Sequence, residues 1–313
     1  MFARCTSFIS LHEAMHTLRR TSWLAFAFLI FVAGCAIPPY LNEDVLVVVS
    51  DTTPAYTRVA DALRARLPGA PRAVQLNGDA RGAEAIVRAQ ARDATTIVAV
   101  GALALQTARR VQIGGRVVFC QVFNYEEPGL MAPTVSGVKA MPPLVKQFRA
   151  WKLLDPKLQR IAVISGPGLR DLPDEAKRAA AELNLQVAHV VVHSDKELVY
   201  TARDRLKGVH GVWVAPDHRV LSAPALREFI THAVRHGTAV MVFNHQLLDE
   251  GAVMSAESDY TEVAERVVDL VLDPESQARL VALKRARVRI NDLAAARLGL
   301  AAPPQFARGT YVF

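Results

Sequence analysis

Short aliphatic runs alternate with amphipathic segments along most of the chain. Residues 45–49 are continuously aliphatic, a pattern typical of a strand that is buried on both faces of a parallel sheet. The next segment spaces its apolar residues three or four positions apart, which places them on one face of a helix: Tyr56, Val59, Ala60, Leu63 and Leu67. This stretch therefore predicts a buried strand followed by a helix.

The same alternation continues to about residue 271. Further strands are predicted at 73–76, 96–100, 117–122, 160–164, 187–192, 211–215, 239–243 and 252–256. Helical faces are predicted within 83–92, 103–111, 142–153, 176–183, 226–234 and 260–271. Residues 306–313 are predicted to form an additional extended segment.

Strands that alternate with helices imply β–α–β units and parallel sheets. The two successive sets of strands predict an α/β protein with two doubly wound parallel-sheet lobes joined by a hinge. A single barrel of eight parallel strands is the alternative, because it has the same alternation. In open sheets the binding loops lie at the carboxyl ends of the strands, near the point where the strand order reverses. Two such lobes are expected to share one cleft.

The N-terminal segment carries an export pattern rather than a domain pattern. Residues 23–32 form an apolar run that follows Arg19 and Arg20. The run is shorter than the roughly 20 residues of a membrane span, but it has the length of a signal-peptide core. Residues 32–35 read Val-Ala-Gly-Cys and resemble the lipobox of bacterial lipoproteins. An apolar helix that merely ends in a cysteine is the alternative.

The lipobox resemblance implies that residues 1–34 are a lipoprotein signal peptide and that Cys35 is the site of lipidation. Residues 35–44 then form a linker, and the protein is held on the periplasmic face of the cell envelope by a lipid anchor. Ala36 stands where an Asp often retains a lipoprotein in the inner membrane, so the outer membrane is favoured. Met15 is an alternative start of the chain.

The length of the chain indicates the number of domains, and its charge limits the classes of partner. The 313 residues suit two domains of roughly 100–150 residues each. We expect the first lobe to comprise residues 42–138 and 250–284, and the second to comprise residues 139–249 and 285–313. The formal net charge of +7 is spread along the chain, and no aromatic-rich basic motif accompanies it. A solvated basic surface is therefore favoured, and nucleic acid is not an expected partner.

Short matches to a known family occur in a fixed order in the second half of the chain: Asp217, Ser222, Ala223, Gly251, Asp259, Tyr260, Asn291 and Leu298-Gly299-Leu300. Together with residues 160–184, they resemble the substrate-binding proteins of an ABC-transporter family, some of whose members bind aromatic amino acids. The likeness spans roughly residues 45–302. It implies the type I periplasmic binding protein fold, a small-molecule ligand, an ABC permease and an ATPase as partners, and no cofactor.

Two departures from the family pattern concern the ligand. The family usually has Gly-Thr after the third strand, where this chain has Gly101-Ala102, so the hydroxyl that could hold a ligand carboxylate is missing. The family Asn beside Asp217 is His218. The resemblance therefore implies the fold more firmly than the ligand.

Loops at the predicted carboxyl ends of strands supply the candidate ligand contacts. Hydroxyls and helix N-terminal amides suit an anionic group, a carboxylate suits an ammonium group, and aromatic rings can stack. Helix caps, tight turns and core packing are the alternative explanation of the same residues. The candidates are Asp51, Thr52, Thr53, Gly101, Ala102, Phe123, Asn124, Tyr125, Gly166, Asp217, His218, Asn244, His245, Asp259 and Tyr260.

Other residue types do not form a recognisable reaction centre. His232 and His236 are four positions apart, but no Glu follows the first His as in metalloproteases, so no metal site is predicted. Cys120 lies in an apolar run and is expected to be a buried hydrophobic residue. No Ser-His-Asp arrangement stands out, which favours binding over catalysis.

These observations predict an extracytoplasmic solute-binding lipoprotein of an ABC-type uptake system, which binds an amino acid or a similar small polar metabolite and is not an enzyme. A sensor or adaptor subunit that reports ligand occupancy to an envelope receptor is one alternative. An envelope enzyme with the same lobes is another. A transcription regulator shares the lobe architecture, but the N-terminus lacks the DNA-binding helix pair that it requires.

Overall fold

The computed structural model describes residues 44–111, 114–204, 206–217, 221–273, 276, 278–306 and 310–313. The predicted signal peptide, the predicted lipidation site Cys35 and the candidate ligand contact His218 lie outside these residues. Both sheets belong to one compact unit, Glu43–Phe313. In the part of the chain that is described, no helix has the length and apolar character needed to cross a membrane.

The first sheet is entirely parallel, in the order β11-β5-β4-β3-β1-β2. Its strands are β1 (Val45–Val49), β2 (Arg72–Gln75), β3 (Thr96–Val100), β4 (Arg116–Cys120), β5 (Val135–Val138) and β11 (Leu280–Val281). Every residue of β1 and β3 is buried, as expected for central strands with helices on both faces. The strand order reverses beside β1, which places a topological switch point between β1 and β3.

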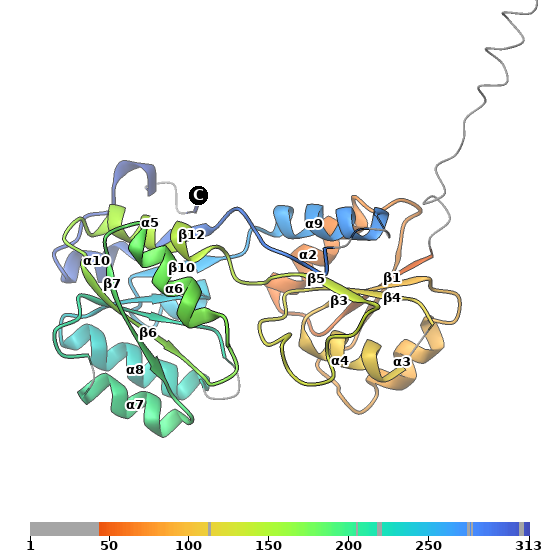
Figure 1. Ribbon diagram of the computed structural model, residues 1–313, viewed down its shortest axis with the longest axis horizontal. Helices are drawn as coiled ribbons and strands as arrows, with labels where there is room; N and C mark the ends of the chain where they lie inside the picture. Colours follow the sequence, from red (N-terminus) through yellow and green to blue (C-terminus); the bar gives the residue numbers. More distant parts are fainter. Residues whose placement is uncertain are drawn as a thin grey trace, which may run out of the picture. The chain divides into compact units, whose positions relative to one another are not determined.

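Helices cover both faces of the first sheet (Figure 1). Val45, Val47 and Val49 pack with α2 (Pro54–Arg64) and α9 (Tyr260–Leu272). The alternate residues Leu46 and Val48 pack with the helices of the opposite face, α3 (Ala83–Gln90) and α4 (Ala102–Val111). The period of two along the strand thus divides the core into two layers.

The second sheet has the order β13-β12-β10-β9-β8-β6-β7. Its parallel strands are β6 (Arg160–Ser165), β7 (Gln186–Val191), β8 (Gly211–Val214), β9 (Ala239–Val242) and β10 (Met254–Glu257). Two antiparallel strands, β12 (Arg287–Ile290) and β13 (Tyr311–Val312), extend one edge. The predicted extended segment at the C-terminus therefore includes β13.

Five α-helices of the described chain pack on this second sheet (Figure 1). One face carries α5 (Leu144–Leu154), α6 (Leu172–Ala181) and α10 (Asp292–Arg297), and the other carries α7 (Asp195–Asp204) and α8 (Ala223–Arg235). Short 3-10 helices follow β9 (η2, His245–Leu248) and precede β13 (η3, Pro304–Phe306). The prediction of two doubly wound parallel-sheet lobes is confirmed, and the single-barrel alternative is excluded because the described strands form two separate sheets.

The chain passes from one sheet to the other in crossover segments at 139–143, 258–259 and 282–286. The strand β10 pairs with β9 and β12 and so belongs to the second sheet, whereas our predicted boundaries placed residues 250–284 in the first lobe. The helix α9 that follows it does pack on the first sheet. The other predicted domain boundaries stay predictions.

One carboxylate fixes the third crossover. Glu262, in the first turn of α9, is only 2% exposed. Its Oε1 accepts a hydrogen bond from Lys284 N, and its Oε2 accepts one from Arg285 N, both at 2.8 Å. The Arg285 and Arg266 side chains lie 3.6 and 3.9 Å from the same carboxylate. The segment that links β11 to β12 is therefore tied to α9 through its own backbone.

Cys120, at the end of β4, is fully buried, as its apolar surroundings in the sequence predict. Burial raises the pKa of its thiol far above the ordinary range, because the thiolate would lie in an apolar layer. Cys120 therefore serves as a core residue of the first sheet.

Candidate functional site

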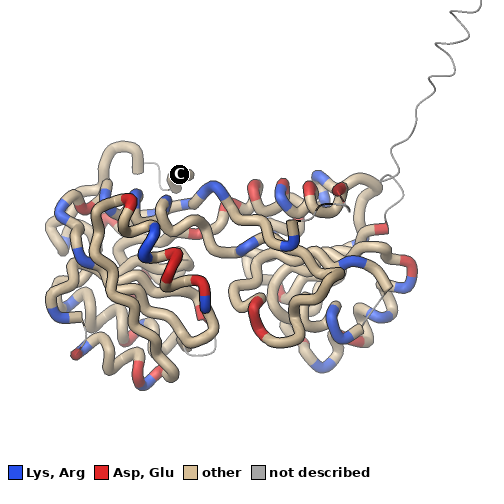
Figure 2. Tube along the Cα trace, viewed as in Figure 1, with Lys and Arg blue, Asp and Glu red and all other residues tan. Residues whose placement is uncertain are grey.

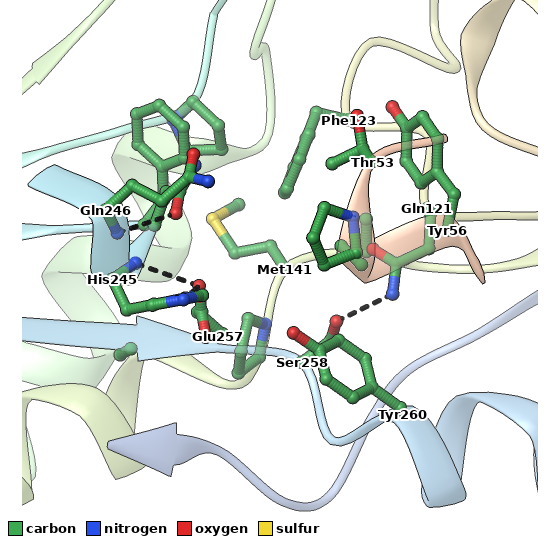
Figure 3. Close-up of a pocket in the computed structure, with 18 of the residues that line it drawn as sticks. Thr53, Tyr56, Gln121, Phe123, Met141, His245, Gln246, Glu257, Ser258 and Tyr260 are labelled. Carbon is green, nitrogen blue, oxygen red and sulfur yellow. Dashed lines mark hydrogen bonds and ion pairs between the residues drawn. The ribbon is translucent and has the colours of Figure 1, made fainter. Parts of the chain in front are cut away.

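Loops from both sheets line one pocket of about 170 Å³, which we call the central pocket (Figure 3). From the first sheet come Thr53 and Tyr56, around the start of α2, and Gln121 and Phe123, after β4. These loops follow the carboxyl ends of β1 and β4, where open parallel sheets carry their binding residues. The switch point of the first sheet is thus next to the pocket.

The second sheet and the crossovers supply the rest of the lining. Its described members are Gln147, Trp213, Pro216, Phe243, Asn244, His245, Gln246, Ala256 and Glu257 from the second sheet and its helix α5, and Ala140, Met141, Pro142 and Ser258 from the crossovers. Pro54 and Ala55 of α2 and Tyr260 of α9 complete the lining. Figure 3 shows His245 and Gln246 on the opposite side of Met141 from Thr53, Tyr56 and Gln121. A molecule held here contacts groups from both sheets and from the segments that join them.

His245 and Glu257 form a paired polar group in the wall of this pocket. Glu257 Oε1 accepts hydrogen bonds from the His245 backbone N–H at 2.9 Å and from His245 Nδ1 at 2.8 Å. A carboxylate can only accept, so Nδ1 carries the proton. The Glu257 side chain is 13% exposed, and its Oε2 makes no hydrogen bond within the described part of the chain. That oxygen remains able to accept a hydrogen bond from a ligand.

Gln121 connects the end of β4 to the second crossover. It has a φ of +57°, which is uncommon for a residue other than glycine and costs about 1–3 kcal/mol. Its side chain is buried, and Nε2 donates a hydrogen bond to Ser258 Oγ at 2.9 Å. Local strain is thus present where a strand end, a crossover and the central pocket meet.

Gln147 fixes the orientation of Trp213. The indole Nε1 of Trp213 donates to Gln147 Oε1 at 3.0 Å, and Gln147 Nε2 donates to the carbonyl oxygen of Pro142 at 2.8 Å. Phe148 packs edge to face against the same indole, with ring centroids 6.4 Å apart. The Trp213 ring is therefore held in one orientation in the wall of the pocket.

A second pocket of about 530 Å³, the adjoining pocket, shares part of this lining. Tyr56, Phe123, Pro216 and Phe243 belong to both pockets. Phe123 and Phe243 meet edge to face with centroids 6.3 Å apart, one from each sheet. The remaining described residues of the adjoining pocket are Ser50, Asp51, Gly78, Ala80, Ala102, Leu103, Asp217 and Leu221.

Gly101 brings α4 close to the first binding loop. Its φ is +91°, and a Cβ built on it would lie 2.6 Å from Ser50 Oγ and 2.9 Å from Tyr56 Cε2. Ser50 Oγ in turn accepts a hydrogen bond from Ala104 N at 2.9 Å. Only glycine fits this backbone conformation and this contact distance together.

Two tyrosines at the site are held in the protonated form. Burial, the Asp51 carboxylate and Cys120 raise the pKa of Tyr56, in that order of size. Burial, with Glu126, Asp171 and Glu175, raises the pKa of Tyr125 to about 12. Both phenols therefore remain hydrogen-bond donors at physiological pH.

The predicted ligand contacts divide into those that line a pocket and those that do not. Thr53, Phe123, Asn244, His245 and Tyr260 line the central pocket, and Asp51, Ala102, Phe123 and Asp217 line the adjoining pocket. Tyr125 lines a side pocket of about 260 Å³ next to the first crossover. Thr52, Gly101, Asn124, Gly166 and Asp259 line none of these pockets.

Some of these predicted contacts support the site rather than line it. Asn124 Nδ2 donates to Asp217 Oδ1 at 3.4 Å, which joins a loop of the first sheet to a loop of the second. Asp259 caps α9 by accepting from Glu262 N at 2.8 Å, the alternative that the sequence offered for such residues. Thr52 is exposed and Gly166 is buried.

Sequence reasoning missed several lining residues: Tyr56, Gln121, Met141, Gln147, Trp213, Phe243, Gln246, Glu257 and Ser258. The sequence pattern places Tyr56 on a helix face and Trp213 in a buried strand. A signal for Tyr56 was available, because it lies in the first turn of a helix that begins at a predicted binding loop. The crossover residues Met141 and Ser258 gave no comparable signal.

Known proteins with solved structures share this fold. A conserved domain protein from Vibrio cholerae is 18% identical, with a TM-score of 0.60, and covers 85% of this chain and 98% of its own. A domain from Streptococcus pneumonia in complex with L-Trp is 16% identical, with a TM-score of 0.61 and coverages of 86% and 98%. A substrate-binding protein with adhesive properties from Clostridium difficile, in its ligand-free open form, is 15% identical, with a TM-score of 0.65 and coverages of 84% and 96%.

The comparison by sequence gives the family. No curated protein matches the chain. The model of the family described as ABC transporter substrate binding protein matches residues 77–304. Since this range covers most of both sheets and most of the lining of the central pocket, the chain belongs to the family of ABC transporter substrate-binding proteins.

Proposed function

We propose that the protein is an extracytoplasmic solute-binding lipoprotein of an ABC-type uptake system and that it binds a small polar metabolite, an amino acid or a similar molecule, in the central pocket. The observation that carries this proposal is the lining of that pocket by loops of both sheets and by the crossovers. A ligand held by groups from two halves stabilises the arrangement in which both halves contact it. In this proposal the protein captures its ligand by binding and does not change it chemically.

The size and chemistry of the pocket support a small ligand with an apolar part. Its volume of about 170 Å³ is below the roughly 300–1,000 Å³ that is usual for pockets of drug-sized ligands. Aromatic side chains and Met141 form much of the lining, and a few polar groups such as Gln121 and Glu257 face the same space. The structurally similar domain from Streptococcus pneumonia, which was solved with L-Trp, makes aromatic amino acids reasonable first probes.

The proposed location follows from the N-terminal pattern of the sequence. Export by residues 1–34 and acylation of Cys35 would leave the two sheets tethered to the cell envelope by a lipid. A permease and an ATPase are the proposed partners, because the family serves ABC transporters. Mass spectrometry of the mature N-terminal peptide tests this part, since the proposal requires a lipid on Cys35.

A thermal-shift screen of amino acids, amines and sugars tests the binding function. A ligand at about 100 times its dissociation constant is expected to add about 2.7 kcal/mol to the free energy of unfolding. For a protein of this size, the Tm then rises by roughly 5–10 °C. Native mass spectrometry of the freshly purified protein is expected to show the same class of molecule bound.

Two variants make this screen specific to the central pocket. Phe123→Ser removes a ring that lines both the central and the adjoining pocket, and it is expected to abolish the shift. Tyr200→Ser alters an aromatic residue that is 61% exposed and lines neither pocket, so the shift is expected to persist. If the ligand still raises the Tm of Phe123→Ser, the ligand binds outside the central pocket. If no compound in the library raises the Tm, the proposed function is wrong.

A further inference from the structure

Charged residues are rare in the lining of the central pocket. Lys, Arg, Asp and Glu occur over both halves of the described chain (Figure 2). Among the described residues that line this pocket, however, Glu257 is the only one of these four types, and it is already paired with His245. The polar side chains that this pocket offers to a ligand are therefore mostly uncharged.

Buried polar side chains of the lining lose water when a ligand fills the pocket, so the ligand has to satisfy them. Three non-aromatic polar side chains of the described lining are at most 6% exposed: Gln121, Gln147 and Ser258. Gln147 uses both of its polar atoms, since Oε1 accepts from Trp213 Nε1 and Nε2 donates to the carbonyl oxygen of Pro142. Gln121 and Ser258 are therefore the buried pair with hydrogen-bonding capacity left.

This pair, Gln121 and Ser258, offers one acceptor and one donor to the pocket. Gln121 Nε2 donates to Ser258 Oγ at 2.9 Å, and Gln121 Oε1 makes no hydrogen bond within the described part of the chain. The hydroxyl proton of Ser258 likewise has no acceptor among the described residues. Figure 3 shows the two joined side chains across the pocket from His245. A ligand can therefore donate to Gln121 and accept from Ser258.

The other orientation of the Gln121 carboxamide presents the same two kinds of group. In that orientation Oε1 accepts from the Ser258 hydroxyl, which leaves Nε2 as a donor and Ser258 Oγ as an acceptor. Both orientations thus place one donor beside one acceptor. A carboxylate only accepts, an ammonium group only donates, and a hydrocarbon does neither, so none of these satisfies the pair.

The positions of the two residues in the fold support a role in binding. Gln121 directly follows β4 of the first sheet, and Ser258 directly follows β10 of the second. Carboxyl ends of parallel strands are where open α/β sheets bind their ligands. The positive φ of Gln121 adds to this, because strained residues of this kind concentrate at functional sites. A group held by the pair is held by strand ends of both sheets.

From these observations we infer that the central pocket selects a ligand whose apolar body carries an uncharged group that both donates and accepts hydrogen bonds, a hydroxyl or a carboxamide. The inference rests on the proposed function and narrows its ligand. The group donates to one member of the pair and accepts from the other, while the apolar body packs among the aromatic rings and Met141. An analogue without this group leaves two buried polar atoms without partners, which lowers its affinity.

Amino acids are suitable probes because their charged groups have other partners in the same lining. Glu257 Oε2 makes no hydrogen bond within the described chain and can accept from an ammonium group. Ala55 N, in the first turn of α2, has no acceptor among the described residues and can donate to a carboxylate. The difference in affinity within a matched pair of amino acids therefore reports on the side chain.

Two matched pairs test the selectivity by isothermal titration calorimetry. L-tyrosine is compared with L-phenylalanine, which lacks the hydroxyl, and L-glutamine with the 5-methyl ester of L-glutamate, whose side chain accepts but cannot donate. In at least one pair, the first member is expected to bind at least about tenfold more tightly, because it satisfies both polar atoms. The pair that shows this preference identifies the group as a hydroxyl or a carboxamide.

Equal or reversed affinities in both pairs, or no binding by any of the four compounds, would overturn the inference. The proposed function would still stand if another compound of the thermal-shift library bound in the central pocket. If no compound of that library bound, the proposed function would be wrong as well.

Serine variants identify the groups responsible. Ser258→Ala is expected to lower the affinity for the preferred amino acid about tenfold and that for its analogue less than about threefold. Ser258→Thr keeps a hydroxyl and is expected to retain the preference. Ser255→Ala removes a buried hydroxyl that has no partner in the described chain and lines neither pocket, so both affinities are expected to stay the same. An equal loss of affinity for both amino acids in Ser258→Ala would mean that Ser258 only holds the crossover, and would refute the assignment.

Discussion

Replacing Glu262 with alanine is expected to lower the free energy of unfolding by about 3–5 kcal/mol, because it removes a buried carboxylate that is both hydrogen-bonded and ion-paired. The carboxylate is 2% exposed and accepts from Lys284 N and Arg285 N, so alanine leaves two backbone donors of the crossover without acceptors. It also removes one of the carboxylates that pair with Arg266 and Arg285, which keep Asp269 and Glu265 as partners. Urea unfolding followed by circular dichroism measures the change.

Two comparison variants show whether the loss of stability comes from the buried contacts of Glu262 or from the loss of any glutamate. Glu228→Ala removes an exposed carboxylate whose ion pair with Arg203 spans 3.5 Å, and it is expected to cost less than about 1 kcal/mol. Glu262→Gln keeps one acceptor oxygen and is expected to fall between the two. A cost for Glu262→Ala no larger than that for Glu228→Ala would show that the crossover does not depend on this carboxylate.

Most strands could be predicted from the sequence, but β5, β11 and β12 could not. β1 is aliphatic throughout, and β3 is aliphatic after Thr96, because both faces of these strands are buried. β5 contains Gly137, which argues against a strand. The glycine is needed there because a Cβ would lie 2.4 Å from the ring of Phe119 on the neighbouring strand. β11 has two residues and leaves no periodic pattern to detect.

The local sequence pattern also does not show which of the two sheets a strand joins. β10 reads Met-Ser-Ala-Glu and lies between β9 and β12, but nothing within its four residues distinguishes that place from the edge of the first sheet. The same limit applies to the helices that cross over. Sequence periodicity gives the buried face of α9 but not the sheet that it covers.

The candidate site was predictable where it lies at strand ends and unpredictable where it depends on tertiary contacts. Phe123 and His245 follow strands directly, so strand-end reasoning found them. Trp213 lies inside a buried strand, and only its hydrogen bond to Gln147 shows that the indole is held in the pocket wall. Met141 reaches the pocket from a crossover, whose path no sequence pattern describes.

Replacing Gly101 with alanine is expected to affect both stability and ligand binding. The backbone has a φ of +91°, so any side chain adds about 1–2 kcal/mol of strain. The new Cβ would lie 2.6 Å from Ser50 Oγ and 2.9 Å from Tyr56 Cε2, and relieving such contacts costs about 1–3 kcal/mol more. We expect a total loss of about 2–5 kcal/mol in the free energy of unfolding, measured by urea denaturation.

The expected loss of ligand affinity distinguishes Gly101 from other glycines with a positive φ. Gly129 has a φ of +85°, but a Cβ there would meet no atom within 4 Å. Gly129→Ala is therefore expected to show the backbone strain alone, about 1–2 kcal/mol, with ligand affinity unchanged. In Gly101→Ala, displacement of Ser50 and Tyr56, which both line the adjoining pocket, is expected to weaken ligand binding at least about tenfold. Equal effects in the two variants would mean that the contact between α4 and the first binding loop does not shape the pocket.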